Sequence, residues 1–140
     1  MPTARFERTY HFTATHHYRR TDWDEARNRA VFGDLADPHE HDWAVTLCTL
    51  GRMADVTGFS VDLPALDALA AEVIGDWQGA DLNAVVPPVA AGEVLPSCEA
   101  LAHWLFGVFA RRLPEGAELL FVRVAESDEI AAMFAAGDEA

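Results

Sequence analysis

Three histidines are spaced so that they could bind one metal ion. His39 and His41 are two residues apart in HEHDW, at the start of an alternating apolar run. On a strand they therefore share one face, while Glu40 points to the other. His16 ends an earlier alternating run, and three neutral imidazoles with one open position are the usual layout of a catalytic zinc site. The alternative is a solvated strand start that binds no metal.

The remaining three histidines lack such a pattern. His11 and His17 fall on the opposite strand face from His16, and His103 lies in a helical segment without a partner. For these three we expect structural or surface roles.

Alternating segments predict the strands that position the histidines. In residues 6–18, aromatic residues alternate and lead to His16, and residues 41–52 continue the pattern after HEH. A third strand is expected at residues 117–127, with Leu120, Val122, Val124 and Glu126 in phase. A short, weak element follows at 128–135.

Two helices are predicted between the second and third strands. Residues 61–77 show helical spacing with Asp62 as cap, and residues 98–112 do so with Ser97 as cap. Residues 19–38 and 78–96 are expected to be loops, the first either without a helix or with a turn of helix near 24–31. The order predicts an α+β domain with helices gathered on one face of an antiparallel sheet.

The composition restricts the class of protein. The chain has 140 residues, of which 51% are hydrophobic, which predicts one soluble domain over residues 1–140. No stretch suits a secretory signal or a membrane span, so we expect a cytoplasmic protein. Two cysteines, Cys48 and Cys98, are too few for a disulfide framework.

The charge pattern argues against a nucleic-acid partner. The net charge is −13, whereas nucleic-acid binding depends on Lys and Arg that neutralise phosphates. All ten basic residues are arginine, and six of them lie in the first 29 residues. They form either a local anion site or solvated side chains on an acidic surface.

Short motifs along most of the chain resemble one enzyme family. They are FTATH (12–16), VFGD (31–34), HEHDW (39–43), VTGFSVDL (56–63), DLN (81–83), PSCEALAHWL (96–105) and VAES (124–127). In this order they are similar to the 6-pyruvoyl-tetrahydropterin synthase and 6-carboxytetrahydropterin synthase family.

The resemblance implies a fold, a metal and a ligand. The fold would be the tunnelling fold (T-fold), an antiparallel four-stranded sheet with two helices on one face, in protomers that assemble into trimers or hexamers. Zn²⁺ would be bound by His16, His39 and His41. Glu126 would anchor a pterin ring, and Ser97 and Cys98 would line the pterin pocket.

The chain departs from the family pattern where protons are transferred. The cysteine that precedes H-x-H in the family is absent, and Asp34, Leu35, Ala36 and Asp37 occupy that region. The Asp-His pair is replaced either by Asp76-Trp77 or by Gln78-Gly79, depending on the alignment. Asp34 or Asp37 is a candidate base, or else a solvated loop carboxylate, and Asp76 would be the remaining member of the pair. Cys98 at a helix start is a further candidate base, or else a small buried residue.

Three functions are compatible with this pattern. The first is a zinc-dependent lyase acting on a small pterin-like molecule of the dihydroneopterin kind, which need not carry a triphosphate. The second is a T-fold zinc enzyme repurposed for another elimination or cyclisation in specialised metabolism. The third is a non-catalytic binding protein that keeps the fold, for example a pterin-binding homologue.

Overall fold

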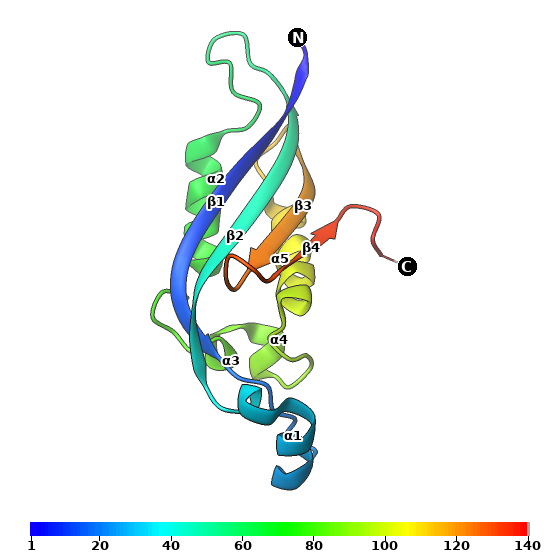
Figure 1. The fold of residues 1–140 in the computed structure, drawn as a ribbon. Helices are drawn as coiled ribbons and strands as arrows, with labels where there is room; N and C mark the ends of the chain where they lie inside the picture. Colours follow the sequence, from blue (N-terminus) through cyan, green and yellow to red (C-terminus); the bar gives the residue numbers. More distant parts are fainter. Residues whose placement is uncertain (140) are drawn as a thin grey trace.

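Four antiparallel strands form one curved sheet. The structure is a computed structural model, and it describes residues 1–139. The strands β1 (Thr3–His16), β2 (His39–Arg52), β3 (Ala117–Ala125) and β4 (Ala131–Ala135) lie in that order across the sheet. The two 14-residue strands β1 and β2 run side by side over their full length (Figure 1). The expected weak element after β3 is therefore a strand.

Two helices cover one face of this sheet (Figure 1). In α2 (Leu63–Ile74) the Asp62 carboxylate accepts from the Ala65 N–H, and in α5 (Cys98–Arg112) the Ser97 hydroxyl accepts from the Ala100 N–H. Both caps satisfy N–H groups that a helix start leaves free. The predicted α+β fold, with two helices on one face of the sheet, is confirmed.

The core lies between the helices and the sheet, where strand residues alternate into it. The large side chains with less than 2% exposure include Trp43, Val45, Leu47, Leu66, Leu101, Leu105, Phe109 and Val122. Phe12 and Ala14 of β1 are buried on the same face. Burying large apolar side chains supplies most of the driving force for folding. His16, next in this alternation, is buried with them.

One strand differs from its predicted phase. A β-bulge between Cys48 and Thr49 leaves Leu120 without a partner in β2, since Thr49 pairs with Leu119 and Cys48 with Phe121. Leu119 is consequently the buried residue, and Leu120 is not in phase with Val122. A bulge adds one residue to one strand, so the alternation shifts by one position.

The two predicted loops contain short helices. Residues 19–38 include α1 (Glu25–Phe32) and the 3-10 turn η1 (Gly33–Ala36). The Asp24 carboxylate caps α1, and Gly33, with a φ of 58°, ends it. Residues 78–96 include α3 (Leu82–Val85), capped by Asp81, and α4 (Pro87–Ala90). The expected turn of helix near 24–31 corresponds to α1, which lies beyond the end of the sheet (Figure 1), whereas α3 and α4 form where only a loop was expected.

Within residues 1–139, none of the helices combines the length and apolar character that crossing a membrane requires.

Candidate metal and ligand site

The strand register brings the three predicted ligands together. His16 is the partner of His39 in the β1–β2 pair, and His41 faces Ala14, one step further along the same face. Each ring offers one nitrogen such that the three nitrogens all lie within 4.8 Å of one another. His16, His39 and His41 therefore form a group that could hold a metal ion.

Backbone carbonyls fix the tautomers of two of these rings. His16 Nδ1 is 2.9 Å from the Pro96 carbonyl oxygen, and His39 Nδ1 is 2.8 Å from that of Asp37. A carbonyl only accepts, so in both rings Nδ1 carries the proton and donates it. Nε2 is thereby left with a lone pair, which is the arrangement that orients a metal-ligating histidine.

Burial keeps His16 neutral. Its ring is fully buried, and this desolvation lowers the pKa of His16 to about 4, against the opposing effect of its hydrogen bond to Pro96. Trp43 packs edge-on against His16, and its Nε1–H donates to the Ala14 carbonyl at 3.1 Å. A neutral, immobile imidazole is the form that binds a metal.

The donor set fits a metal ion. His16 Nε2 is buried and has no hydrogen-bond partner among the described residues. A buried polar atom without a partner costs free energy, so its position needs an explanation. A cation bound between His16, His39 and His41 would supply the missing partner. His41 is 26% exposed, which leaves the group open on one side.

Glu126 reaches this group from the end of β3. Ala125 pairs with Ala44, so Glu126 follows on the face that carries Val124. One carboxylate oxygen, Oε2, is 3.3 Å from His16 Nε2 and 3.2 Å from His41 Nε2. Glu126, the predicted pterin-binding residue, therefore lies directly beside the three predicted metal-binding histidines.

Ser97 and Cys98 lie at the start of α5, next to the residue that binds His16. The Ser97 hydroxyl is engaged as the helix cap, and Cys98 is buried. Burial and the neighbouring Glu126 carboxylate raise the pKa of Cys98 to about 11. At neutral pH this residue is a thiol, so the helix start does not make it a thiolate base.

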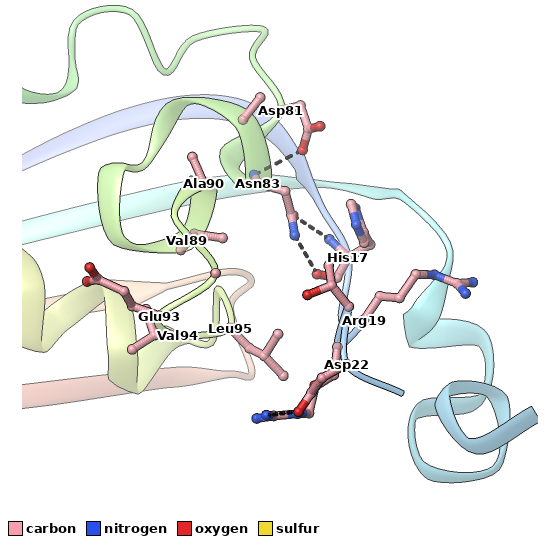
Figure 2. Close-up of a pocket in the computed structure, with 14 residues that line it drawn as sticks. His17, Arg19, Asp22, Asp81, Asn83, Val89, Ala90, Glu93, Val94 and Leu95 are labelled. Atoms are coloured by element: carbon pink, nitrogen blue, oxygen red, sulfur yellow. Dashed lines mark hydrogen bonds and ion pairs between the residues drawn. The ribbon is translucent and has the colours of Figure 1, made fainter. Parts of the chain in front are cut away.

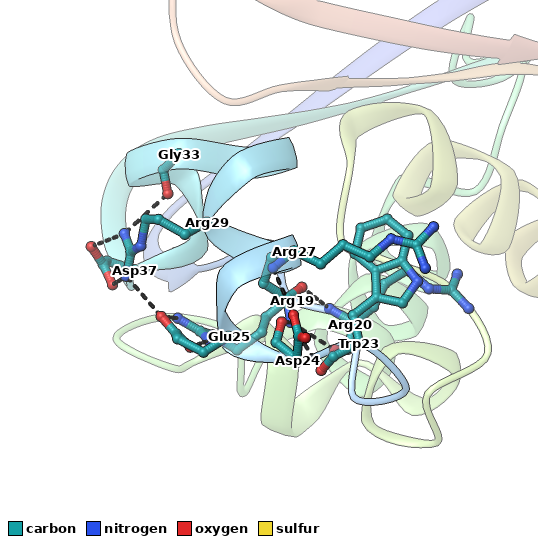
Figure 3. A network of polar contacts seen from close by, with 10 residues as sticks. Arg19, Arg20, Trp23, Asp24, Glu25, Arg27, Arg29, Gly33 and Asp37 are labelled. Carbon is teal, nitrogen blue, oxygen red and sulfur yellow. Dashed lines mark hydrogen bonds and ion pairs between the residues drawn. The ribbon is translucent and has the colours of Figure 1, made fainter.

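The three candidate aspartates have different surroundings. Asp37 forms a two-pronged ion pair with Arg29, with both N···O distances 2.9 Å, and this contact lowers the pKa of Asp37 (Figure 3). Asp34 is exposed in η1. Asp76 is exposed and lines a hollow with Trp104 and Arg112 on the helical side of the molecule. The described contacts bring none of the three side-chain carboxylates to the histidine nitrogens; Asp37 contacts His39 only through its backbone carbonyl.

The segment that replaces the family's Asp-His pair packs against β1. Trp77 is buried, with its ring edge-on to Phe12. The Gln78 side-chain oxygen accepts from the Thr13 N–H at 3.1 Å. Gly79 has a φ of 72°, a conformation in which a histidine would be strained. Neither alignment thus places a second proton-transferring histidine here.

Two residues of the site were missed in the sequence. The Tyr18 ring lies edge-on to His16, with centroids 5.1 Å apart, and stacks on His39 at 6.5 Å. Its position two residues after His16 was the available signal. Pro96 acts through its carbonyl alone, and no pattern in the sequence indicates that contact.

Two arginines of the arginine-rich N-terminal segment are paired with nearby carboxylates. Arg20 pairs with Asp22 at 2.8 and 2.9 Å, and Arg19 pairs with Glu25. Both arginines line a cavity of about 380 Å³ that also contains Asp22, Asp81 and Glu93 (Figure 2). The carboxylates outnumber the arginines there, which favours the paired surface arrangement over the anion site.

The other histidines lie apart from the metal-ligand group. His17 lines the cavity of Figure 2, where the Asn83 side chain accepts a hydrogen bond from the His17 backbone N–H and donates one to the His17 carbonyl. His11 is exposed on β1, and His103 pairs with Glu139 at 2.8 Å.

Comparison with known proteins gives one family and one fold. The sequence model described as 6-pyruvoyl tetrahydropterin synthase matches residues 5–136. No curated protein matches the chain in sequence. The 6-pyruvoyl tetrahydropterin synthase of Caenorhabditis elegans superposes with a TM-score of 0.83 at 20% identity, over 98% of each chain.

Two further structures share the fold. An uncharacterized protein from Wolinella succinogenes has a TM-score of 0.69 at 13% identity, over 97% of this chain and 99% of that one. A Plasmodium vivax 6-pyruvoyltetrahydropterin synthase has a TM-score of 0.62 at 10% identity, over 96% of this chain and 98% of that one. That structure is a mutant in which cysteine replaces a catalytic glutamate. The expected T-fold is confirmed.

Proposed function

The chain belongs to the 6-pyruvoyl tetrahydropterin synthase family, and from this membership we propose that it is a zinc-dependent lyase acting on a dihydroneopterin-like substrate. The observation that carries the proposal is the group of His16, His39 and His41, with the buried Nε2 of His16 lacking a partner. Three nitrogen ligands and an open side are typical of catalytic zinc. A bound Zn²⁺ would polarise the substrate side chain and make its C–H and O–H bonds more acidic.

The side chains around the group would bind and orient the substrate. The Glu126 carboxylate would accept from the paired N–H donors of the aminopyrimidine ring. Tyr18 would form an aromatic wall beside His16 and His39. Ser97 and Cys98 would border the ring at the start of α5.

Proton transfer would depend on a carboxylate. We assign the base to Asp34, because Asp37 is held by Arg29 and Asp76 lies on the helical side. The P. vivax relative offers a precedent, since its catalytic residue is a glutamate. General acid-base groups contribute about 100- to 10,000-fold. Asp34→Asn should therefore slow turnover at least about 100-fold, whereas Asp37→Asn should not.

The proposed substrate need not carry a triphosphate. Of the four arginines between His16 and His39 in the sequence, three, Arg19, Arg20 and Arg29, are each paired with a carboxylate. The net charge of −13 also disfavours a polyanion. Dihydroneopterin and its triphosphate should be compared as substrates, and we expect the unphosphorylated compound to be accepted.

Metal content is the primary test. Protein purified without chelator should contain about one zinc per chain, which His41→Ala should lose and His11→Ala, an exposed histidine on the same sheet, should retain. Metal contents that do not differ between the wild type and His41→Ala would refute the site.

Pterin binding separates the candidate functions. Glu126→Ala should abolish binding of neopterin while metal still loads at saturating concentration. Zinc without pterin binding would favour a repurposed zinc enzyme instead, and absence of both would favour a non-catalytic protein that keeps the fold.

A further inference from the structure

Glu126 has a contact that pterin binding alone does not explain. Its Oε2 atom lies within 3.3 Å of two histidine nitrogens, and its side chain is only 13% exposed. A carboxylate whose only role was to bind a pterin would be expected to face water when no pterin is bound. This one turns toward the metal-ligand group.

The contact between Glu126 and His16 brings two acceptors together. Because His16 Nδ1 donates to the Pro96 carbonyl, Nε2 of the neutral ring presents a lone pair. The Glu126 oxygen is also an acceptor, and the geometry makes no hydrogen bond between them. A shared cation resolves the contact without charging the ring.

The distances from Glu126 to two of the three histidines agree with a shared metal ion. In a tetrahedral zinc site with bonds of about 2.0 to 2.1 Å, neighbouring ligand atoms are roughly 3.3 Å apart. The Oε2 atom is 3.3 and 3.2 Å from the nitrogens of His16 and His41. The carboxylate oxygen thus has the spacing of a fourth ligand to two of the three histidines.

We propose that Glu126 is the fourth metal ligand of the substrate-free protein, and that it leaves this position to anchor the pterin ring. This inference rests on the proposed function. Glu126 closes the site at rest, because four protein ligands leave no open position. Pterin binding moves the carboxylate to the ring N–H donors and frees the fourth position for the substrate side chain. The site is therefore open only when its ligand is present.

Cobalt binding tests the proposal without turnover. Metal-free protein is titrated with Co²⁺ in competition with a chelator, and the visible bands of Co²⁺ report the ligand number. Glu126→Gln should weaken Co²⁺ binding at least about tenfold and change the bands. The matched control is Glu40→Gln, which removes the same charge between the two ligand histidines but on the exposed face. It should leave affinity and bands unchanged.

A second measurement uses the wild-type protein. Adding neopterin to the Co²⁺ form should shift the bands, because one ligand is exchanged. Equal affinity and identical bands for Glu126→Gln, Glu40→Gln and wild type, with no shift on adding neopterin, would overturn the inference while the three-histidine site stands. If wild type binds no Co²⁺ or Zn²⁺, the proposed function fails as well.

Discussion

At the scale of single residues, the proposed function requires a base for proton transfer, and the two cysteines are the first residues to consider. A base near neutral pH needs a pKa near that range. Cys98 is buried beside Glu126, and both effects raise its pKa to about 11. Cys48 is also buried, which raises its pKa above the usual value for a thiol. Neither cysteine therefore has a pKa suited to a base near neutral pH, and neither replaces the cysteine that the family resemblance implies before H-x-H.

We predict that both thiols resist alkylation in the folded protein. The thiolate is the nucleophile, and at pH 8 a thiol with a pKa of about 11 is roughly 0.1% ionised. Iodoacetamide at pH 8, followed by mass spectrometry, should modify Cys98 at least about 100-fold more slowly than in urea-unfolded protein. Rapid modification of Cys98 in the folded state would restore it as a candidate base.

At the scale of elements, β1 and α2 are joined by a polar cluster. The Asp67 carboxylate of α2 accepts from the Tyr10 hydroxyl at 2.6 Å and from Arg8 Nε at 3.0 Å. The hydrogen bond from Tyr10, followed by that from Arg8, lowers the pKa of Asp67. A lowered carboxyl pKa means that the folded state binds a proton less readily than the unfolded chain does. The stabilisation is therefore present above the unfolded pKa and is lost as the pH falls.

Asp67→Asn should reveal this pH dependence. We expect it to lower the free energy of unfolding at pH 7 by about 1 kcal/mol, a modest value because the carboxylate is 39% exposed and screened by solvent. The difference from wild type should shrink as the pH falls below about 4, where the unfolded carboxyl is protonated. Urea unfolding at pH 7, 5 and 3 would measure it, with Asp55→Asn in an exposed turn as the control. A difference that stays constant with pH would contradict an ionic contribution from Asp67.

The elements also differ in how far their sequences determined them. The helix at 98–112 was predicted to the residue, because Ser97 caps it and its apolar spacing is regular. For α1 the sequence indicated only a turn of helix near 24–31, because its cap Asp24 and its end at Gly33 occur in a segment without apolar periodicity. The phase of β3 was wrong because the bulge depends on pairing with β2.

In the candidate site too, some residues could be predicted from local sequence patterns and others could not. HEHDW and His16 could be found because strand periodicity is local. The contacts from Pro96 and Tyr18 depend on how α5 and the end of β1 pack together, which no local pattern encodes.

At the scale of the whole molecule, the sheet ends in an exposed strand. β4 is the last strand of the sheet, and Met133 on it and Ile130 just before it are each more than half exposed. An exposed edge strand with apolar residues is a template for pairing with another chain. The family resemblance predicts a trimer or hexamer, which corresponds to three or six times 15.3 kDa. Light scattering after gel filtration should give one of these masses.

A proline in β4 tests whether this edge forms the assembly. The Ala136 N–H donates to Leu120 and the Ile130 carbonyl accepts from Glu126, so even-numbered residues bond to the β3 side. The backbone N–H and C=O groups of the odd-numbered residues point away from β3, as the hydrogen bond from the Ala135 N–H to the Asp138 side chain shows. Met133→Pro therefore removes an outward N–H and leaves the β3 pairing in place. We expect this variant to be monomeric with a native circular dichroism spectrum, whereas Val56→Asp in an exposed loop keeps the wild-type mass. A Met133→Pro protein that keeps the wild-type mass would place the interface elsewhere.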